Sequence, residues 1–170
     1  MKHRIGIFYG STYFGTARAA EMIHRRIGAR WSDLRDVAGS TADDLVPYRH
    51  VLFGSSTYGL GALQHDWDTF IWELCKAELA GKKAAVFALG DQIVWDRTFV
   101  DSMGTIYDAL MAGGATVVGA WPTEGCAFQY SAGARDGRFV GLALDKMNQP
   151  ELHETRIREW VARVLREFEA

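Results

Sequence analysis

Residues 84–89, Ala-Ala-Val-Phe-Ala-Leu, form an apolar run with no polar residue in it. A strand of this kind is covered on both of its faces, as happens in a parallel sheet that lies between two layers of helices. The shorter runs Ile5–Tyr9 and Val51–Phe53 are also largely apolar, and all three runs end at a glycine. The chain therefore has to supply helices for both faces of a sheet.

Helical patterns separate the strand candidates. Apolar residues recur at helical spacing in four stretches, which are Ala20, Ile23 and Ile27; Trp67, Phe70, Ile71 and Leu74; Phe99, Met103, Ile106, Tyr107 and Leu110; and Ile157, Trp160, Val161, Val164, Leu165 and Phe168. Residues 31–37 and 116–118 are two further strand candidates. This alternation predicts an α/β fold with a doubly wound, five-stranded parallel sheet and helices on both faces. No repeat or linker divides residues 1–170, so we expect a single domain.

A long irregular segment follows the start of the fifth strand candidate. Residues 121–138 contain glycine, serine and aromatic residues in no periodic pattern, and apolar character returns at residues 139–144. A loop of this length in a small domain is usually functional or a family-specific insertion. We therefore expect a long insertion that interrupts the fifth strand.

The bulk properties exclude several classes of protein. A net charge of −2, from 19 Lys and Arg against 21 Asp and Glu, does not indicate a nucleic-acid-binding protein. No apolar run approaches the length of a membrane span, and the chain enters a strand with no signal peptide before it. Cys75 and Cys126 lie far apart, and the histidines show no ligand spacing, so no metal site is expected. We expect a cytoplasmic monomer.

The stretch from Gly10 to Thr16 joins the first strand to the first helix. Loop amides and the positive end of a helix dipole make such a place suited to an anion, and Ser11, Thr12 and Thr16 add hydroxyl donors. The sequence has the glycine spacing of a P-loop but Thr-Ala where that motif requires Lys-Ser/Thr, and it has no dinucleotide fingerprint. It predicts a phosphate cradle, while a turn that only reverses the chain is the alternative.

Two further loops end strands and carry aromatic residues. Residues 55–61 contain Tyr58, and residues 90–98 contain Asp91 and Trp95. Ligands of doubly wound sheets bind at the carboxyl ends of the strands, where two facing aromatic rings can enclose a flat heterocycle. The alternative is that each ring only packs on its neighbouring loops.

Four stretches resemble long-chain flavodoxins, and the likeness extends over essentially the whole chain. They are residues 5–10, 89–93, 120–125 and 137–145, of which the last, Gly-Arg-Phe-Val-Gly-Leu-Ala-Leu-Asp, is highly specific. The resemblance implies the flavodoxin-like fold, one non-covalent FMN and no catalytic residue. It also implies an electron-transfer protein, not an enzyme, which carries one electron at a time from an NAD(P)H-dependent flavodoxin/ferredoxin reductase to low-potential acceptor enzymes.

The resemblance assigns FMN-binding residues to four groups. The phosphate would be held by Ser11, Thr12, Tyr13, Phe14, Gly15 and Thr16. One face of the flavin ring would be covered by Thr57, Tyr58, Gly59, Leu60 and Gly61, and the other by Trp95. The pyrimidine edge would be bound by Leu89, Gly90 and Asp91.

Two physical expectations follow from this assignment. Stacked aromatic rings with few cations nearby disfavour negative charge on the flavin, which would make the second reduction step strongly reducing. Gly59 would allow the Tyr58–Gly59 peptide to flip on one-electron reduction at little conformational cost.

The sequence departs from the family pattern in the phosphate loop. Tyr13 stands where a hydroxyl donor of Ser/Thr type is expected, and Phe14 where glycine lets the backbone approach the phosphate. Either Gly15 takes over the turn through a local shift, or the two aromatic residues fill or reshape the cradle. Two other functions therefore stay open: an interaction module with weakened flavin binding, and a small FMN-dependent quinone or nitro reductase.

Overall fold

The apolar runs of the sequence form a parallel sheet in the computed structural model, which describes residues 3–170. Its strands are β1 (Ile5–Tyr9), β2 (Ser32–Asp36), β3 (His50–Ser56), β4 (Lys83–Leu89) and β5 (Thr116–Val118), in the order β2-β1-β3-β4-β5. Every neighbouring pair along this path is parallel. The predicted five-stranded, doubly wound sheet is confirmed, and its strand order reverses between β1 and β3.

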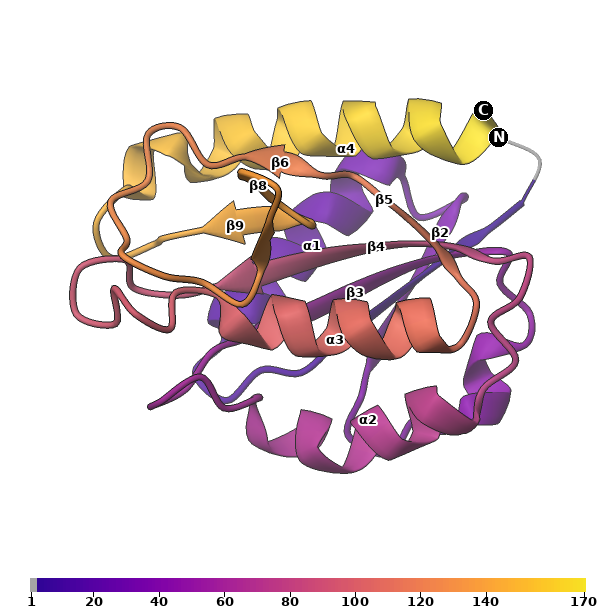
Figure 1. Ribbon diagram of the computed structural model, residues 1–170. Coiled ribbons are helices and arrows are strands. Elements are labelled where there is room, and N and C mark those ends of the chain that lie inside the picture. The colour runs from indigo at the N-terminus through magenta and orange to yellow at the C-terminus, as the bar shows by residue number, and fades with distance from the viewer. Residues whose placement is uncertain (1–2) are drawn as a thin grey trace.

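The fifth strand is split, as predicted. Strand β5 pairs with Lys83–Ala85 of β4, and β9 (Leu142–Leu144) pairs with Phe87–Leu89 on the same edge. The segment between them forms a small antiparallel sheet of β6 (Trp121–Pro122), β8 (Arg138–Phe139) and β7 (Ala134–Arg135). Figure 1 shows this insertion in orange beside the edge of the main sheet.

Helices cover both faces of the sheet. Helices α1 (Gly15–Ile27) and α4 (His153–Glu169) pack on one face, and α2 (His65–Lys76) and α3 (Asp101–Ala112) pack on the other (Figure 1). Two short 3-10 helices, η1 (Ala42–Leu45) and η2 (Pro150–Leu152), lie in connections. Within residues 3–170, every helix is too short or too polar to cross a membrane.

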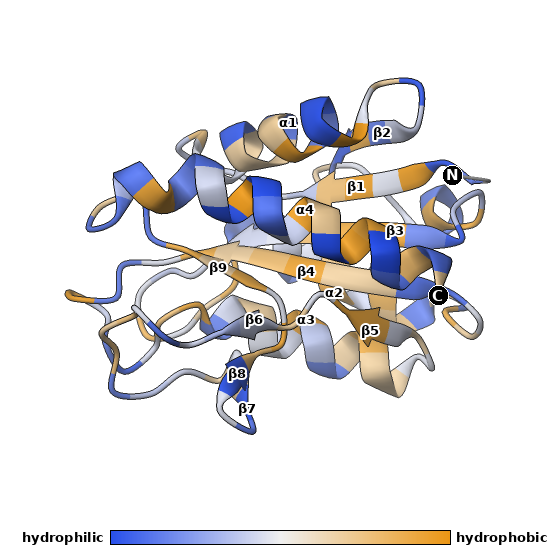
Figure 2. Ribbon diagram, turned by 90° about the horizontal axis from the view of Figure 1, so that it is seen from above, coloured by the Kyte–Doolittle hydropathy of each residue, from blue (hydrophilic) through white to orange (hydrophobic). Residues whose placement is uncertain are grey.

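The apolar run of β4 explains why both faces need helices. Ala85, Phe87 and Leu89 belong to the core cluster under α1 and α4, whereas Ala84 and Val86 belong to the cluster under α2 and α3. Side chains of a strand alternate between its faces, so a strand buried on both sides is apolar at every position. The apolar colour of the central strands is visible in Figure 2.

His50 lies at the amino-terminal end of β3, and the folded structure disfavours its protonation. The ring of His50 stacks on Phe168 of α4, with centroids 4.5 Å apart and planes 5° apart. Burial lowers the pKa of His50; the positive charges of His3, Arg49 and Lys83 lower it further, and Glu169 acts in the opposite direction. The folded chain thus binds protons at this site more weakly than the unfolded chain, whose histidine pKa is about 6.5.

We expect the free energy of unfolding to decrease as the pH falls below about 6.5, because protons then bind preferentially to the unfolded state. Urea unfolding at several pH values between 5 and 8 measures this slope. His50→Phe keeps an aromatic ring on Phe168 but cannot titrate, so its slope should be smaller. His153, whose pKa is also lowered by burial, supplies part of the slope that remains. Equal slopes in the two proteins would contradict the assignment to His50.

Candidate functional site

A cleft of about 460 Å³ opens at the carboxyl ends of the strands. Its walls come from the loops after β1, β3 and β4 and from the segment after β9. The residues that line it are Ser11, Tyr13, Gly15, Thr16, Ser56, Thr57, Tyr58, Gly59, Leu89, Gly90, Asp91, Trp95, Lys146 and Met147. The cleft lies where the strand order reverses, which is the usual ligand position in such sheets. The fold therefore brings the three loops chosen from the sequence to one place.

The loop after β1 presents hydrogen-bond donors that have no acceptor in the protein. Among residues 3–170, no acceptor is found for the backbone N–H groups from Ser11 to Thr16. The hydroxyl oxygen of Thr16 is buried and also has no partner there. A buried polar group without a partner costs about 1–3 kcal/mol. The donors lie at and just before the N-terminus of α1, where the helix dipole favours an anion.

The two aromatic residues of this loop leave the cradle open. The side chains of Tyr13 and Phe14 are 80% and 72% exposed. Phe14 is the N-cap of α1 and has φ of 60°, the left-handed conformation that glycine adopts more easily. Gly15 begins α1 and is not among the residues with positive φ. Phe14 itself therefore makes the turn, and neither a shift to Gly15 nor a ring inside the cradle is observed.

We expect Phe14→Gly to raise the free energy of unfolding by about 1 kcal/mol, because a non-glycine residue in this conformation costs about that much or more. Thermal or urea unfolding of the flavin-free chain measures the change. Tyr13→Gly is the matched control, since Tyr13 is equally exposed but has no positive φ. It should give no gain, and an equal gain in both variants would contradict the strain at Phe14.

A buried glutamine, which the sequence analysis missed, supports the same loop. The Nε2 group of Gln64 donates to Thr12 Oγ1 (3.2 Å), and its Oε1 accepts from the N–H of Asp66 (3.2 Å) at the start of α2. The indole of Trp67 donates to the carbonyl of Gly54 (2.8 Å). A Cβ at Gly10 would meet Gln64 and would lie 2.7 Å from Trp67 Cδ1. Gly10 is thus required by packing against α2.

The loop after β3 is a short hairpin. Tyr58 and Ala62 exchange two backbone hydrogen bonds of 2.9 and 2.8 Å, and Gly59 and Gly61 have φ of 50° and 93°. The carbonyl of Tyr58 is therefore occupied, which argues against rotation of the Tyr58–Gly59 peptide. The carbonyl of Gly59 accepts only a 3.4 Å bond from Thr98 Oγ1. The carbonyl of the Gly59–Leu60 peptide is thus held less firmly than that of Tyr58–Gly59, and the flip of Tyr58–Gly59 stays a prediction.

Several residues assigned to the site do not line the cleft: Thr12, Phe14, Leu60 and Gly61. Thr12 contacts Gln64, and Leu60 is 90% exposed at the tip of the hairpin. A Cβ at Gly61 would lie 2.8 Å from Asp101 Oδ2. Since none of the four lines the cleft, any contribution of theirs to a ligand would come from the backbone of their loops.

The loop after β4 offers backbone groups to a ligand. Among the described residues, neither the carbonyl of Gly90 nor the N–H of Asp91 has a protein partner, whereas the N–H of Gly90 donates to the carbonyl of Leu144 (3.0 Å). An acceptor and a donor thus stand side by side at the edge of the cleft. Trp95, 42% exposed, lines this part of it, and Tyr58 comes from the hairpin.

The carboxylate of Asp91 serves its own loop. Its Oδ1 accepts hydrogen bonds from the N–H groups of Ile93 (3.0 Å) and Val94 (2.9 Å) and from Asn148 Nδ2 (2.8 Å). Partial burial acts to raise the pKa of Asp91, but the hydrogen bonds from Val94, Asn148 and Ile93 outweigh it, and the pKa is lowered. Asp91 therefore stays ionised while it holds the loop in shape.

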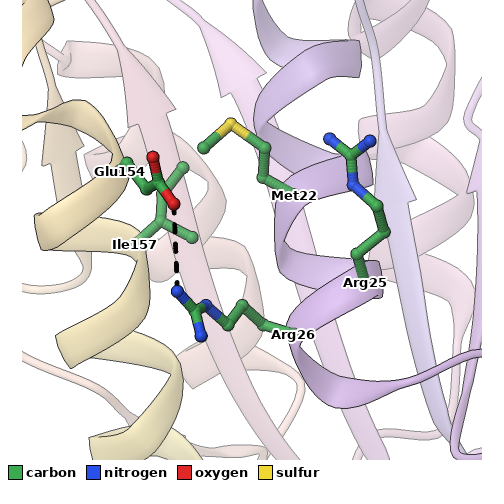
Figure 3. Close-up of a pocket in the computed structure, with 5 residues that line it drawn as sticks. All are labelled: Met22, Arg25, Arg26, Glu154 and Ile157. Atoms are coloured by element: carbon green, nitrogen blue, oxygen red, sulfur yellow. Dashed lines mark ion pairs between the residues drawn. The ribbon is translucent and has the colours of Figure 1, made fainter.

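A second hollow lies between α1 and α4 and is shown in Figure 3. Arg26 and Glu154 approach to 3.9 Å across it, and Arg25, Met22 and Ile157 complete its lining. Exposed ion pairs of this kind stabilise little. None of the buried unpartnered polar atoms found in residues 3–170 belongs to this hollow, so the cleft at the strand ends is the stronger candidate.

Comparison with known proteins agrees with this geometry. The sequence profile of the family described as Flavodoxin matches residues 7–160. The chain is 40% identical over 169 residues to Flavodoxin 1 of Azotobacter vinelandii, covering 97% of each chain. It is 42% identical over 164 residues to Flavodoxin 1 of Escherichia coli K12, covering 96% of this chain and 93% of the relative.

Solved structures show the same fold. A flavodoxin of Fusobacterium nucleatum, solved bound to flavin mononucleotide, superposes with a TM-score of 0.93 at 26% identity, over 97% of this chain and 98% of that one. Flavodoxin 2 of Bacillus cereus, solved in its oxidised form, superposes with a TM-score of 0.74 at 23% identity. With the split fifth strand and the cleft at the strand ends, these matches show that the chain belongs to the flavodoxin family.

Proposed function

We propose that this chain is an electron carrier that binds one FMN non-covalently in the cleft. The observation that carries the proposal is the row of unpartnered N–H donors from Ser11 to Thr16, together with the buried, unpartnered hydroxyl of Thr16. A phosphate could accept hydrogen bonds from these donors at the N-terminus of α1, and it would offset the cost of leaving the buried Thr16 hydroxyl without a partner. Flavodoxins are electron-transfer proteins, and the similar Fusobacterium nucleatum protein was solved with flavin mononucleotide.

The lining residues would divide the binding between them. The cradle would hold the phosphate, Tyr58 and Trp95 would cover the two faces of the ring, and the Gly90 carbonyl and Asp91 N–H would bind its polar edge. FMN supplies one-electron redox chemistry when it is bound. The protein would orient it, limit the access of water to its faces and set the charge around it.

The partners we propose are an NAD(P)H-dependent flavodoxin/ferredoxin reductase and low-potential acceptor enzymes, which the protein would serve as a cytoplasmic monomer. A net charge of −2 provides little long-range electrostatic steering. Association with partners should therefore depend only weakly on salt concentration.

The first experiment is an absorption spectrum of the purified protein, followed by titration of the flavin-free form with FMN and with riboflavin. The expected result is stoichiometric FMN uptake with quenching of its fluorescence, and weaker binding of riboflavin, which has no phosphate for the cradle. A protein that binds neither flavin would contradict the proposal and favour an interaction module. Oxidation of NAD(P)H without added reductase would instead favour the quinone or nitro reductase.

A further inference from the structure

The segment after β9 is fixed at the cleft by a buried carboxylate. Asp145 is 1% exposed, and its Oδ1 accepts from the N–H groups of Met147 (3.0 Å) and Asn148 (2.9 Å). Its Oδ2 accepts from the N–H of Gln92 (3.0 Å) and from Asn148 Nδ2 (2.8 Å). Since Asn148 Nδ2 also donates to Asp91 (2.8 Å), the segment is tied to the loop after β4. Residue 146 is therefore held in a defined position.

Lys146 contributes a positive charge to the cleft wall. It and Asp91 are the charged residues of the lining. No ion pair or hydrogen bond joins Lys146 to another residue within 3–170. Asp145 is buried and fully hydrogen-bonded, and Asp91 Oδ1 already accepts from three donors. The positive charge of Lys146 also lowers the pKa of His153 at the start of α4. Because no hydrogen-bonded or ion-paired carboxylate in residues 3–170 neutralises it, it can also act on a charge inside the cleft that it lines.

Stacked aromatic rings with few cations nearby would make the second reduction of a bound flavin strongly unfavourable. Lys146 changes that expectation, because a cation within several ångströms of a partly enclosed site lowers the free energy of negative charge there. Its segment is tied to the Asp91 loop through Gln92 and Asn148, and not to the Ser11–Thr16 cradle. The backbone of this segment therefore lies beside the loop that would meet the polar edge of the ring, and we assign the charge of Lys146 to that end of the cleft.

We propose that Lys146 tunes the second one-electron reduction of bound flavin, making it more favourable than the aromatic walls alone would allow. This inference rests on the proposed FMN binding. Lys146 has no role in holding the phosphate, and the first reduction step, which need not leave net negative charge on the ring when a proton is taken up, depends on it less. The chain thus combines an open, aromatic cleft with a local cation that moderates its most negative potential.

The test is a spectroelectrochemical titration of the FMN-loaded protein at fixed pH, which gives the midpoint potentials of both steps. Lys146→Gln should change the equilibrium constant of the second step about threefold to tenfold, which lowers its midpoint potential by about 28–59 mV for one electron. Lys146→Glu should lower it further, and added salt should reduce the effect of both variants. The control Lys76→Gln removes an equal charge at the far end of α2, where Lys76 pairs with Glu73.

The outcomes separate this inference from the proposed function. Flavin uptake with a second midpoint that Lys146→Gln leaves unchanged, or shifts only as much as Lys76→Gln does, would overturn the role of Lys146 alone. Weaker binding of FMN with unchanged riboflavin binding and unchanged potentials would assign Lys146 to the phosphate and overturn it as well. An unmodified chain that takes up no FMN would overturn both proposals.

Discussion

Thr16→Val should weaken FMN binding about tenfold to a hundredfold while it makes the flavin-free chain more stable. A hydrogen bond to a charged group contributes about 1.5–3 kcal/mol, and each 1.4 kcal/mol is a factor of ten in affinity. Valine has the shape of threonine without its hydroxyl. Because the hydroxyl of Thr16 is buried without a partner, its removal should raise the free energy of unfolding by about 1 kcal/mol.

Riboflavin and a second threonine provide the controls. Riboflavin has no phosphate, so its affinity should be the same for the Thr16→Val variant and the unmodified chain. Thr12→Val removes a hydroxyl that accepts a hydrogen bond from Gln64 at 3.2 Å and lies outside the cleft wall. That variant should lose stability instead of gaining it. If Thr16→Val weakened FMN and riboflavin equally, Thr16 would not be a phosphate ligand.

Most of the fold could be predicted because burial on both faces leaves a simple pattern. The uninterrupted run at residues 84–89 marks β4 as central, and its residues alternate between the two helix layers. The second strand was harder to predict, because residues 31–37 have a mixed pattern. Strand β2 covers Ser32–Asp36 at the edge of the sheet, where two of its five residues are exposed. An edge strand needs few apolar residues, so its limits are only weakly encoded.

The candidate site was predicted where a motif is contiguous and missed where the fold assembles it. Lys146 and Met147 line the cleft because β9 continues the edge of β4 that β5 began. The sequence predicted that the fifth strand resumes at residues 139–144, but residues 145–148 carry no glycine-rich or aromatic motif that would assign them to the cleft. Gln64 was missed for a similar reason, since its contact with Thr12 joins residues 52 positions apart.

The backbone of the phosphate loop could not be predicted from residue types alone. Tyr13 and Phe14 depart from the family pattern, and their size indicated a filled or shifted cradle. The structure keeps the turn by placing Phe14 in the left-handed conformation, and both aromatic side chains stay largely exposed. Conformational strain of about 1 kcal/mol is small compared with the binding energy that an anion gains from several free N–H donors.

Gly141→Ala should cause the largest loss of stability, about 3 kcal/mol or more. Gly141 lies between β8 and β9, and a Cβ there would overlap the carbonyl oxygen of Val86 and would lie 2.8 Å from its carbonyl carbon. Backbone atoms of a central strand cannot move aside as a flexible side chain can, so relief requires β9 to leave the edge of β4. Urea unfolding measures the loss.

The same displacement should reach the cleft, which makes the prediction more specific than a loss of stability. The carbonyl of Leu144 in β9 accepts a hydrogen bond from the N–H of Gly90, and Asp145 fixes the segment of Lys146. FMN affinity should therefore fall about tenfold under conditions where the variant is still folded.

Gly137→Ala, in the same insertion, is the matched control: Gly137 has φ of 76° with open space around its Cβ position. It should cost only the backbone strain of about 1 kcal/mol and leave FMN binding unchanged. If both variants lost the same stability and kept the same affinity, the contact between Gly141 and Val86 would not hold β9 and the cleft together.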